Sequence, residues 1–193
     1  MNFQLSARAK ELIPKARIVS FATWSPTYPE VALAALQAAD DEGRYLTDAD
    51  LIILEATAIP SAAQLAAARL LRDRASEIVT AARKQVLANY PGIAEPGGSL
   101  YPAVRAEACW RDFWHFLRCI TYGIAGGQLE FMSAEGLHYM NLLYQELRVP
   151  LEAMVSGLEA LKLVSVVQLE PLGATLPFDS YFDRPIASLR AFH

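Results

Sequence analysis

The chain has 193 residues, of which 53% are hydrophobic and 20% are charged. This composition excludes an intrinsically disordered chain, and the length corresponds to one domain with a sizeable core. The formal net charge is −4. A protein that binds nucleic acid without sequence preference is normally basic, so that class is disfavoured. No run reaches the ~18 consecutive apolar residues of a membrane span.

The N-terminal segment, residues 1–28, has an amphipathic pattern and is predicted to be a helical extension of a main domain over residues 29–193. Charged residues between positions 8 and 17 interrupt any apolar run, which excludes a secretory signal. Pro14 predicts a break in a helix that docks on its own domain or on a partner, with a membrane surface as the weaker alternative. The apolar stripe consists of Phe3, Leu5, Leu12, Ile13 and Phe21.

Helix-forming residues dominate the rest of the chain, and short Pro and Gly punctuation separates them. Thr47 followed by acidic residues is a typical helix start. Residues 164–169 are rich in valine and locally β-like, and 171–177 read as a loop. Six to eight helices without a convincing strand pattern predict an all-α fold. The helices are expected over 29–39, 47–59, 61–90, 101–124, 133–147, 150–163 and 180–190.

The predicted helix over 101–124 carries the residues with chemical potential. Arg105, Cys109, Asp112 and Phe116 are four, three and four positions apart, so they share one stripe of the helix. Spacing alone favours a simpler interpretation, namely a buried cysteine beside an Arg–Asp pair. With two cysteines in all, no disulfide framework is expected, and a reducing cytoplasm fits best.

Several other chemistries lack the residues that they need. Two cysteines ten positions apart and three scattered histidines do not make a zinc site. No phosphate-binding loop, nucleophile elbow or acid–base constellation stands out, so an enzyme is not expected. A haem group would need a proximal ligand, for which His115 or His138 could serve, although a histidine packed in the core is the more common case.

The segment 109–127 reads CWRDFWHFLRCITYGIAGG. It resembles the central segment of the phycobiliproteins, in which Cys-x-Arg-Asp is followed by Leu-Arg, Thr-Tyr and an ending of small residues. ADDEGRYL at 39–46 is similar to an early motif of that family. Further similarities lie at the Asn-Tyr-Pro of 89–91, at the Val-Pro of 149–150 and at the Ser-Tyr-Phe-Asp of 180–183. The resemblance covers residues 29–191 and implies a globin-like helical domain preceded by helices that pair with a partner.

The resemblance also implies a ligand, a linear tetrapyrrole (bilin) of the phycocyanobilin kind, linked through a thioether to Cys109. Asp112 would accept hydrogen bonds from the two central pyrrole nitrogens, and Arg111 would face a propionate. A helical wheel places Arg105 beside Cys109, so Arg105 is a second propionate candidate. Plain core packing is an alternative for each aromatic residue that is a candidate for the pocket wall. These candidates are Trp110, Trp114, Phe116, Tyr122, Tyr139 and Tyr144.

The implied partners are a bilin, a second copy of the chain or another subunit of the family, and a bilin lyase. Asp40 and Arg118 match an acid and an arginine that pair across the family's subunit contact. The implied role is light harvesting, energy transfer or bilin handling, in the cytoplasm or at the periphery of the thylakoid membrane. The alternatives are a pigment-free interaction protein that docks on phycobilisome or membrane partners, and a haem globin or sensor. The long N-terminal segment, the β-like 164–177 and His115 depart from the family pattern.

Overall fold

The computed structural model describes residues 4–172 and 177–193. Within them the chain forms nine α-helices, three short 3-10 helices and one isolated antiparallel bridge, so the predicted all-α class is confirmed. The α-helices are α1 Ala7–Leu12, α2 Glu30–Asp41, α3 Asp48–Glu55, α4 Ala62–Asp73, α5 Ala75–Asn89, α6 Ala103–Ala125, α7 Ala134–Leu147, α8 Leu151–Leu169 and α9 Asp179–Arg190; the 3-10 helices are η1 Ile13–Lys15, η2 Ala22–Trp24 and η3 Glu170–Leu172.

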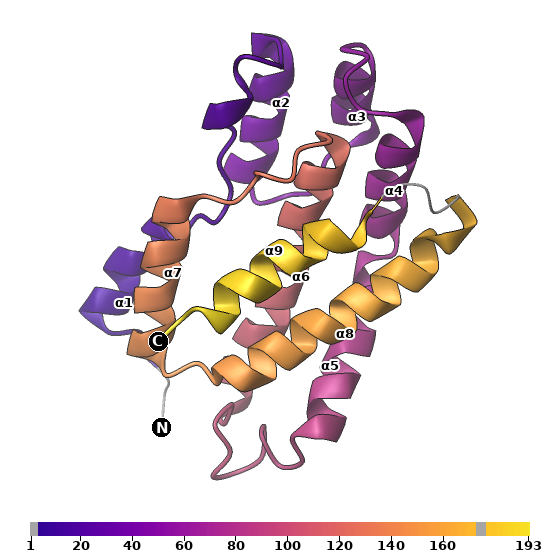
Figure 1. Cartoon of the computed structure of the whole chain (residues 1–193). Helices are drawn as coiled ribbons and strands as arrows, with labels where there is room; N and C mark the ends of the chain where they lie inside the picture. Colours follow the sequence, from indigo (N-terminus) through magenta and orange to yellow (C-terminus); the bar gives the residue numbers. More distant parts are fainter. Residues whose placement is uncertain (1–3, 173–176) are drawn as a thin grey trace.

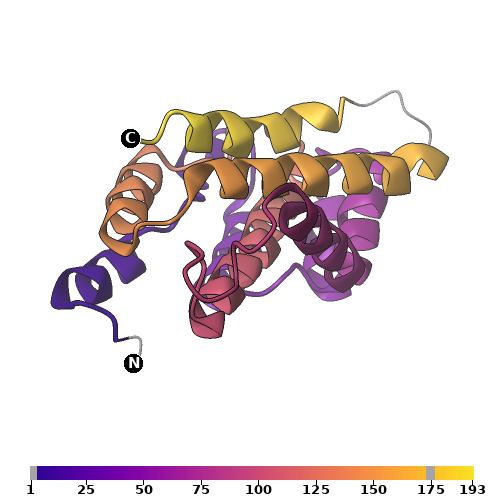
Figure 2. The same cartoon turned by 90° about the horizontal axis from the view of Figure 1, so that it is seen from below.

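The helices are arranged around α6, which is buried along most of its length. Helices α8 and α9 run side by side along one face, and α5 packs against α8 (Figure 2). Helix α4 packs against α6, and α1 packs against α7. Helices α2 and α3 stand together at one end of the molecule (Figure 1).

Side-chain caps mark several helix starts, as the sequence predicts for Thr47. The Thr47 hydroxyl accepts from the Asp50 amide, while the Asp50 carboxylate accepts from the Thr47 amide at 2.8 Å. Ser61 and Gln64 form the same reciprocal pair at the start of α4. Each cap satisfies backbone N–H groups that the helix itself leaves without partners.

Two predictions about secondary structure are wrong. The single helix predicted over 61–90 is divided at Arg74, where neither proline nor glycine marks a break. Each part packs on a different neighbour, α4 on α6 and α5 on α8, so tertiary packing divides a sequence of uniform helix propensity. The β-like segment 164–169 is the last part of α8, because packing against α9 and α4 overrides the weak strand preference of valine. The predicted loop 171–177 lies partly outside the described residues.

A close crossing holds α8 against α6. A Cβ atom placed on Gly157 would lie 2.0 Å from Cζ of Phe113, which is fully buried in the core. A side chain at this position of α8 would therefore overlap the aromatic ring. The glycine therefore lets the two helices approach closely.

The N-terminal segment lies on the same body as the helices that follow. Leu12 and Phe21 of the predicted apolar stripe are buried, whereas Ile13 is exposed and Phe3 lies outside the described residues. Pro14 falls in η1, directly after α1, where a break is predicted. The domain boundary proposed between residues 28 and 29 stays a prediction.

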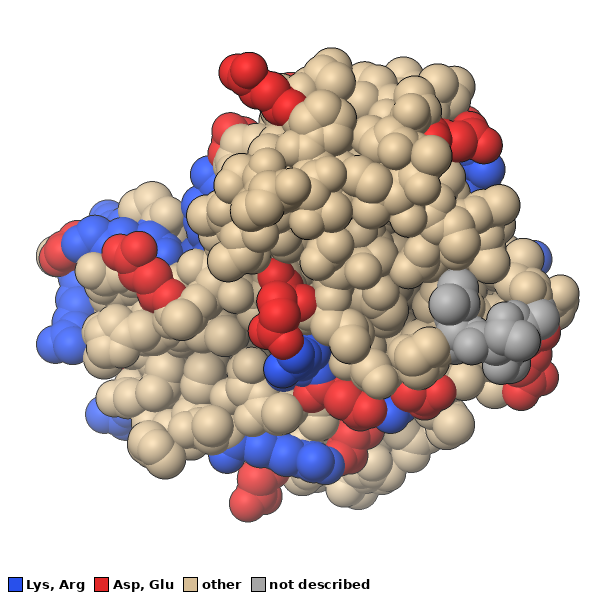
Figure 3. All heavy atoms as spheres, turned by 45° about the horizontal axis from the view of Figure 1, so that its top comes forward, with Lys and Arg blue, Asp and Glu red and all other residues tan. Residues whose placement is uncertain are grey.

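Charged side chains of both signs are interspersed on the face shown in Figure 3. Red and blue residues lie next to each other along its margins and lower half, around a broad uncharged area. The described residues also form exposed ion pairs, such as Arg74 with Glu77 at 2.8 Å. Such pairs stabilise the fold little, roughly 0–1 kcal/mol each.

Candidate functional site

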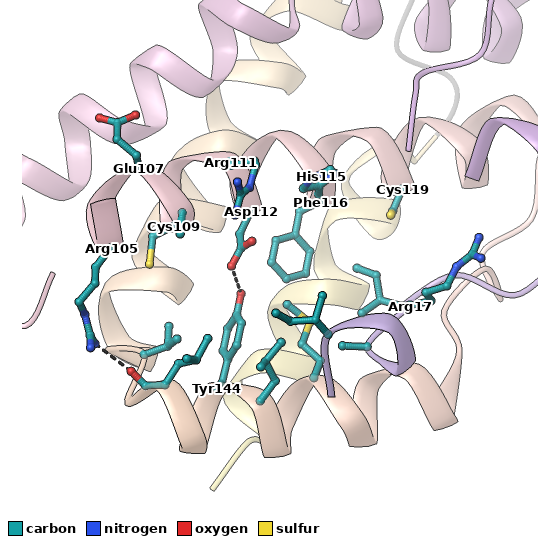
Figure 4. A pocket seen from close by; sticks show the side chains of 18 of the residues that line it. Arg17, Arg105, Glu107, Cys109, Arg111, Asp112, His115, Phe116, Cys119 and Tyr144 are labelled. Atoms are coloured by element: carbon teal, nitrogen blue, oxygen red, sulfur yellow. Dashed lines mark hydrogen bonds between the residues drawn. The ribbon is translucent and has the colours of Figure 1, made fainter. Parts of the chain in front are cut away.

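A crevice of about 890 Å³ runs along α6 on the side that faces α7 (Figure 4). Its volume falls within the roughly 300–1,000 Å³ that is typical of small-molecule and cofactor sites. Helix α6 supplies one wall, α7 supplies the second, and residues of the N-terminal segment complete the lining. The α6 residues that line it are Val104, Arg105, Glu107, Ala108, Cys109, Arg111, Asp112, His115, Phe116, Arg118 and Cys119.

The predicted thiol and carboxylate lie one helical turn apart and both point into this crevice, toward Tyr144 of α7 (Figure 4). Tyr144 donates its hydroxyl hydrogen to Oδ2 of Asp112 at 2.9 Å. Burial raises the pKa of Asp112 to about 6, although the Tyr144 hydrogen bond and Arg111 act in the opposite direction. Burial likewise raises the pKa of the Cys109 thiol to about 12. At neutral pH the site therefore holds a mostly ionised carboxylate and a protonated thiol.

Two predicted arginines line the crevice. The guanidinium of Arg105 donates to the main-chain oxygens of Leu147 and Arg148, at 2.8 and 3.2 Å. These acceptors end α7, so the helix terminus fixes the position of a cation at the Cys109 end of the crevice. Arg111, which is exposed, is part of the lining two positions beyond Cys109. The structure thus brings both propionate candidates to the same cavity.

His115 also lines the crevice, on the same helix. Burial, followed by the nearby Arg118 and Arg111, lowers its pKa to about 4, so the imidazole is neutral at pH 7. Its Nδ1 atom is buried and has no hydrogen-bond partner among the described residues. His138, the other predicted haem ligand, does not line the crevice.

The geometry does not support Tyr122 as a wall residue. The Tyr122 ring is fully buried outside the crevice lining. Its hydroxyl accepts a hydrogen bond from Arg118 at 2.7 Å and donates to the main-chain oxygen of Arg44. Tyr122 therefore joins α6 to the turn after α2. Phe116 and Tyr144 line the crevice as predicted, whereas Trp110, Trp114 and Tyr139 do not.

Asp40 and Arg118, predicted at a subunit contact, are joined within one chain. Nη1 of Arg118 lies 2.9 Å from Oδ1 of Asp40, and both side chains are buried. Arg17 binds the other oxygen, Oδ2, at 2.5 Å. The carboxylate thus holds two guanidinium groups together at the end of the crevice that is far from Cys109.

Sequence reasoning missed the contribution of the N-terminal segment to the crevice. An apolar stripe containing Leu5 and Ile13 was a signal that this segment docks, but nothing in the pattern indicates which surface it covers. Five of its residues line the cavity, namely Leu5, Ile13, Ala16, Arg17 and Ile18.

Two further findings concern the described ranges 4–172 and 177–193. No helix within them is both long and apolar enough to cross a membrane. Within the same ranges no cluster of three or more His, Cys, Asp or Glu side chains could hold a metal ion.

A globin-like helical domain in which a thiol and a carboxylate face one crevice is typical of a protein that binds an organic ligand. Comparison with known proteins identifies the family. Residues 34–189 match the model of the phycobilisome protein family. This chain belongs to that family. It is 28% identical over 160 residues to an allophycocyanin alpha chain of Anabaena cylindrica, covering 83% of this chain and 99% of the relative.

Other similar proteins support the same family assignment. An allophycocyanin alpha-B chain of Cyanidium caldarium is 32% identical over 151 residues, covering 78% of this chain and 93% of the relative. A solved structure is also similar, that of a far-red fluorescent biliprotein derived from an allophycocyanin F subunit of Chroococcidiopsis thermalis. It superposes with a TM-score of 0.61 at 25% identity and covers 66% of this chain and 96% of its own. The predicted family and its globin-like fold are confirmed.

Proposed function

We propose that this protein binds a bilin in the crevice along α6, for light harvesting, energy transfer or bilin handling. The observation that carries the proposal is that Cys109 and Asp112, one turn apart, both face a single cavity of about 890 Å³. The names of its relatives, allophycocyanin chains and a fluorescent biliprotein, support the same ligand class. A bound bilin would supply visible absorption.

The residues present fit such a ligand. Asp112 offers a carboxylate whose two oxygens can accept several hydrogen bonds, and Tyr144 already holds one of these oxygens in place. A charged acceptor aimed at inner pyrrole nitrogens would keep a flexible conjugated chain in one conformation. Phe116 and the aliphatic residues of α7 supply the apolar contacts that ligand pockets usually have.

Cys109 is the proposed attachment point. Addition of its S–H across an exocyclic double bond of the pigment would form a C–S bond and place the hydrogen on the neighbouring carbon. The thiolate is the reactive form, and burial keeps the pKa of this thiol near 12. Spontaneous attachment at neutral pH should therefore be slow, which supports a lyase as a partner.

Arg105 and Arg111 are the proposed ligands of the two propionates. Guanidinium groups bind carboxylates through paired hydrogen bonds, and both line the crevice. Arg105 is the better positioned of the two, because the end of α7 fixes its guanidinium. Arg111 is more exposed and could adjust to the ligand.

Pairing with a second copy or another family subunit is part of the proposal. Helices α2 and α3 stand at one end of the molecule and carry the exposed apolar side chains Val31 and Ile52 (Figure 1). Apolar side chains left in solvent at such a site are typical of an interaction surface. We infer that a protein with the proposed pigment-binding role lies in the cytoplasm and contacts the thylakoid surface.

The test is to co-express the chain with a phycocyanobilin pathway, record the absorption spectrum, and inspect an acid-urea gel for pigment. We expect the wild-type protein to show visible absorbance that survives denaturation. The Cys109→Ala variant should lack this absorbance. Cys119→Ala is the matched control, because Cys119 is also buried, lines the same crevice and sits on the same helix. A colourless wild-type protein would contradict the proposal. A Soret band that His115→Ala removes would instead identify a haem protein.

A further inference from the structure

The segment that closes the crevice lies outside the region matched by the family. That match begins at residue 34, whereas Leu5, Ile13, Ala16, Arg17 and Ile18 precede it. These residues line the same cavity as Cys109 and Asp112. We define residues 4–20 as the arm. Part of the site is therefore built from a segment that precedes the residues matched by the family.

The arm is attached to the start of α7 through its backbone. The amide of Ser133 donates to the carbonyl of Ile18 at 2.7 Å, and the amide of Ser20 donates to the carbonyl of Phe131 at 3.0 Å. A Cβ atom on Gly136 would lie only 1.6 Å from the carbonyl oxygen of Arg17. The arm thus rests directly on the backbone of α7, and the glycine is what gives it room.

A polar contact fixes the arm to α2 as well. The guanidinium of Arg17 bridges Asp40 and Asp41, at 2.5 and 2.6 Å. Since Asp40 is buried and also bound to Arg118, this bridge connects the arm to the core. Two independent attachments, one to α7 and one to α2, hold the C-terminal part of the arm in place at the Arg17 end of the crevice.

The arm runs along α7, and its Arg17 end lies at the end of the crevice that is furthest from Cys109 (Figure 4). Figure 4 shows Arg105 and Cys109 at one end of the crevice and Cys119 and Arg17 at the other. The two cysteines are ten positions apart on the helix, which is about 15 Å at 1.5 Å per residue. Ile13 lines the crevice, and 45% of its surface remains exposed to solvent. An apolar side chain left open on a cavity wall is one that a bound ligand would cover.

We propose that the arm is a wall of the pigment site, in which Ile13 packs on the tetrapyrrole and Arg17 holds the arm in position. This inference rests on the proposed function and adds a contact that the family pattern does not supply. The wall excludes water from the part of the pigment that it covers and limits the movement of that part. Ile13 is a contact residue, and Arg17 is a positioning residue.

Limited proteolysis of the full chain tests the contact. Trypsin cleaves after Lys15 and Arg17, and cleavage requires the arm to open locally. Phycocyanobilin bound against the arm stabilises the closed form, so we expect the loaded protein to be cut about tenfold more slowly there than the pigment-free protein. Ile13→Ser should reduce this protection about fivefold, because the apolar contact is lost, and should weaken the pigment's fluorescence. Covalent loading at Cys109 should not change.

Val167→Ser is the matched control, because Val167 is also an exposed branched aliphatic residue, is more exposed than Ile13, and lies on α8 outside the lining of the crevice. The control variant should show the same protection from trypsin and the same pigment fluorescence as the wild type. If the loaded wild type is cut as fast as the pigment-free protein, or if Ile13→Ser behaves like Val167→Ser, the arm does not contact the pigment and this inference fails alone. If the wild type takes up no pigment, the proposed function and this inference fail together.

Discussion

The Tyr144 hydroxyl on α7 donates a 2.9 Å hydrogen bond to the Asp112 carboxylate on α6. This bond spans the crevice, and it opposes the effect of burial on the pKa of Asp112. A carboxylate that is buried and also ionised at neutral pH needs such a donor. The pair therefore prepares an anionic acceptor inside an otherwise apolar cavity.

Tyr144→Phe should raise the pKa of Asp112 above its value of about 6, since the mutation removes the only side-chain donor that the described residues provide to it. Hydrogen bonds to charged groups contribute roughly 1.5–3 kcal/mol, so the rise should be about one unit or more. The carboxyl resonance of Asp112, followed by ¹³C NMR against pH in the pigment-free protein, measures it. Tyr139→Phe, on the same helix but outside the crevice, is the control. An unchanged pKa in Tyr144→Phe would contradict the role given to the hydroxyl.

Asp112→Asn should change how stability depends on pH. The pKa of Asp112 is about 6 in the folded protein and 3.8 in its ordinary state. Between these values the folded state binds more protons than the unfolded state, so this group makes the unfolding free energy fall as the pH rises from about 4 to 6. Above pH 6 its destabilising contribution is constant, on the order of 1–3 kcal/mol.

The comparison that isolates this effect is the difference between the unfolding free energies of wild type and Asp112→Asn, measured with urea at several pH values. The difference should grow in favour of the variant between pH 4 and 6 and then level off. Acidic groups elsewhere, such as Asp48, whose pKa its arginine partners lower, contribute a slope of the opposite sign. That slope cancels in the difference. A difference that is independent of pH would show that Asp112 titrates normally.

The sequence predicts the helices well where caps and periodicity agree, as at Thr47, and it predicts that Cys109 and Asp112 share a face because helical geometry is local. It fails at Arg74 and over 164–169. At both places the outcome depends on which helix packs against the segment, and that contact joins residues far apart in the chain.

The difference between local patterns and contacts that join distant parts of the chain also decides which residues of the site could be predicted. Tyr144 could be predicted as an aromatic wall, but its bond to Asp112 depends on how α7 lies on α6. Tyr122 fits an aromatic wall equally well by type, yet the fold points it at Arg44. That Ile13 and Arg17 of the N-terminal segment line the crevice follows from a backbone contact with α7, which no local pattern encodes.

Gly136→Ala should detach the arm from α7, because its Cβ atom would overlap the carbonyl oxygen of Arg17. Alanine favours a helix more than glycine does, so a loss of stability here would come from the contact and not from helix propensity. We expect the unfolding free energy to fall by about 1–3 kcal/mol. Amide hydrogen exchange should accelerate at Ser20 and Ser133, which donate across the junction. Exchange in α8 reports on the rest of the fold and should be unaffected, and unchanged protection of both serines would rule out the contact.

Asp40→Asn should be strongly destabilising, whereas Asp41→Asn should not be. Both carboxylates bind Arg17, but the Asp40 side chain is 6% exposed and that of Asp41 is 51% exposed. Only Asp40 also neutralises Arg118, whose guanidinium is buried beside Tyr122. Breaking a buried ion pair from one side leaves an uncompensated charge and costs about 3–5 kcal/mol.

An exposed pair such as Arg17 with Asp41 contributes roughly 0–1 kcal/mol. Urea unfolding of the two variants at pH 7 therefore gives a matched comparison between adjacent residues with the same chemical change. High salt should reduce the small effect of Asp41→Asn and leave that of Asp40→Asn nearly constant, because a buried pair is screened less than an exposed one. If the two variants lost equal stability, the Asp40–Arg118 pair would not be the link between α2 and α6 that holds the distal end of the crevice in place.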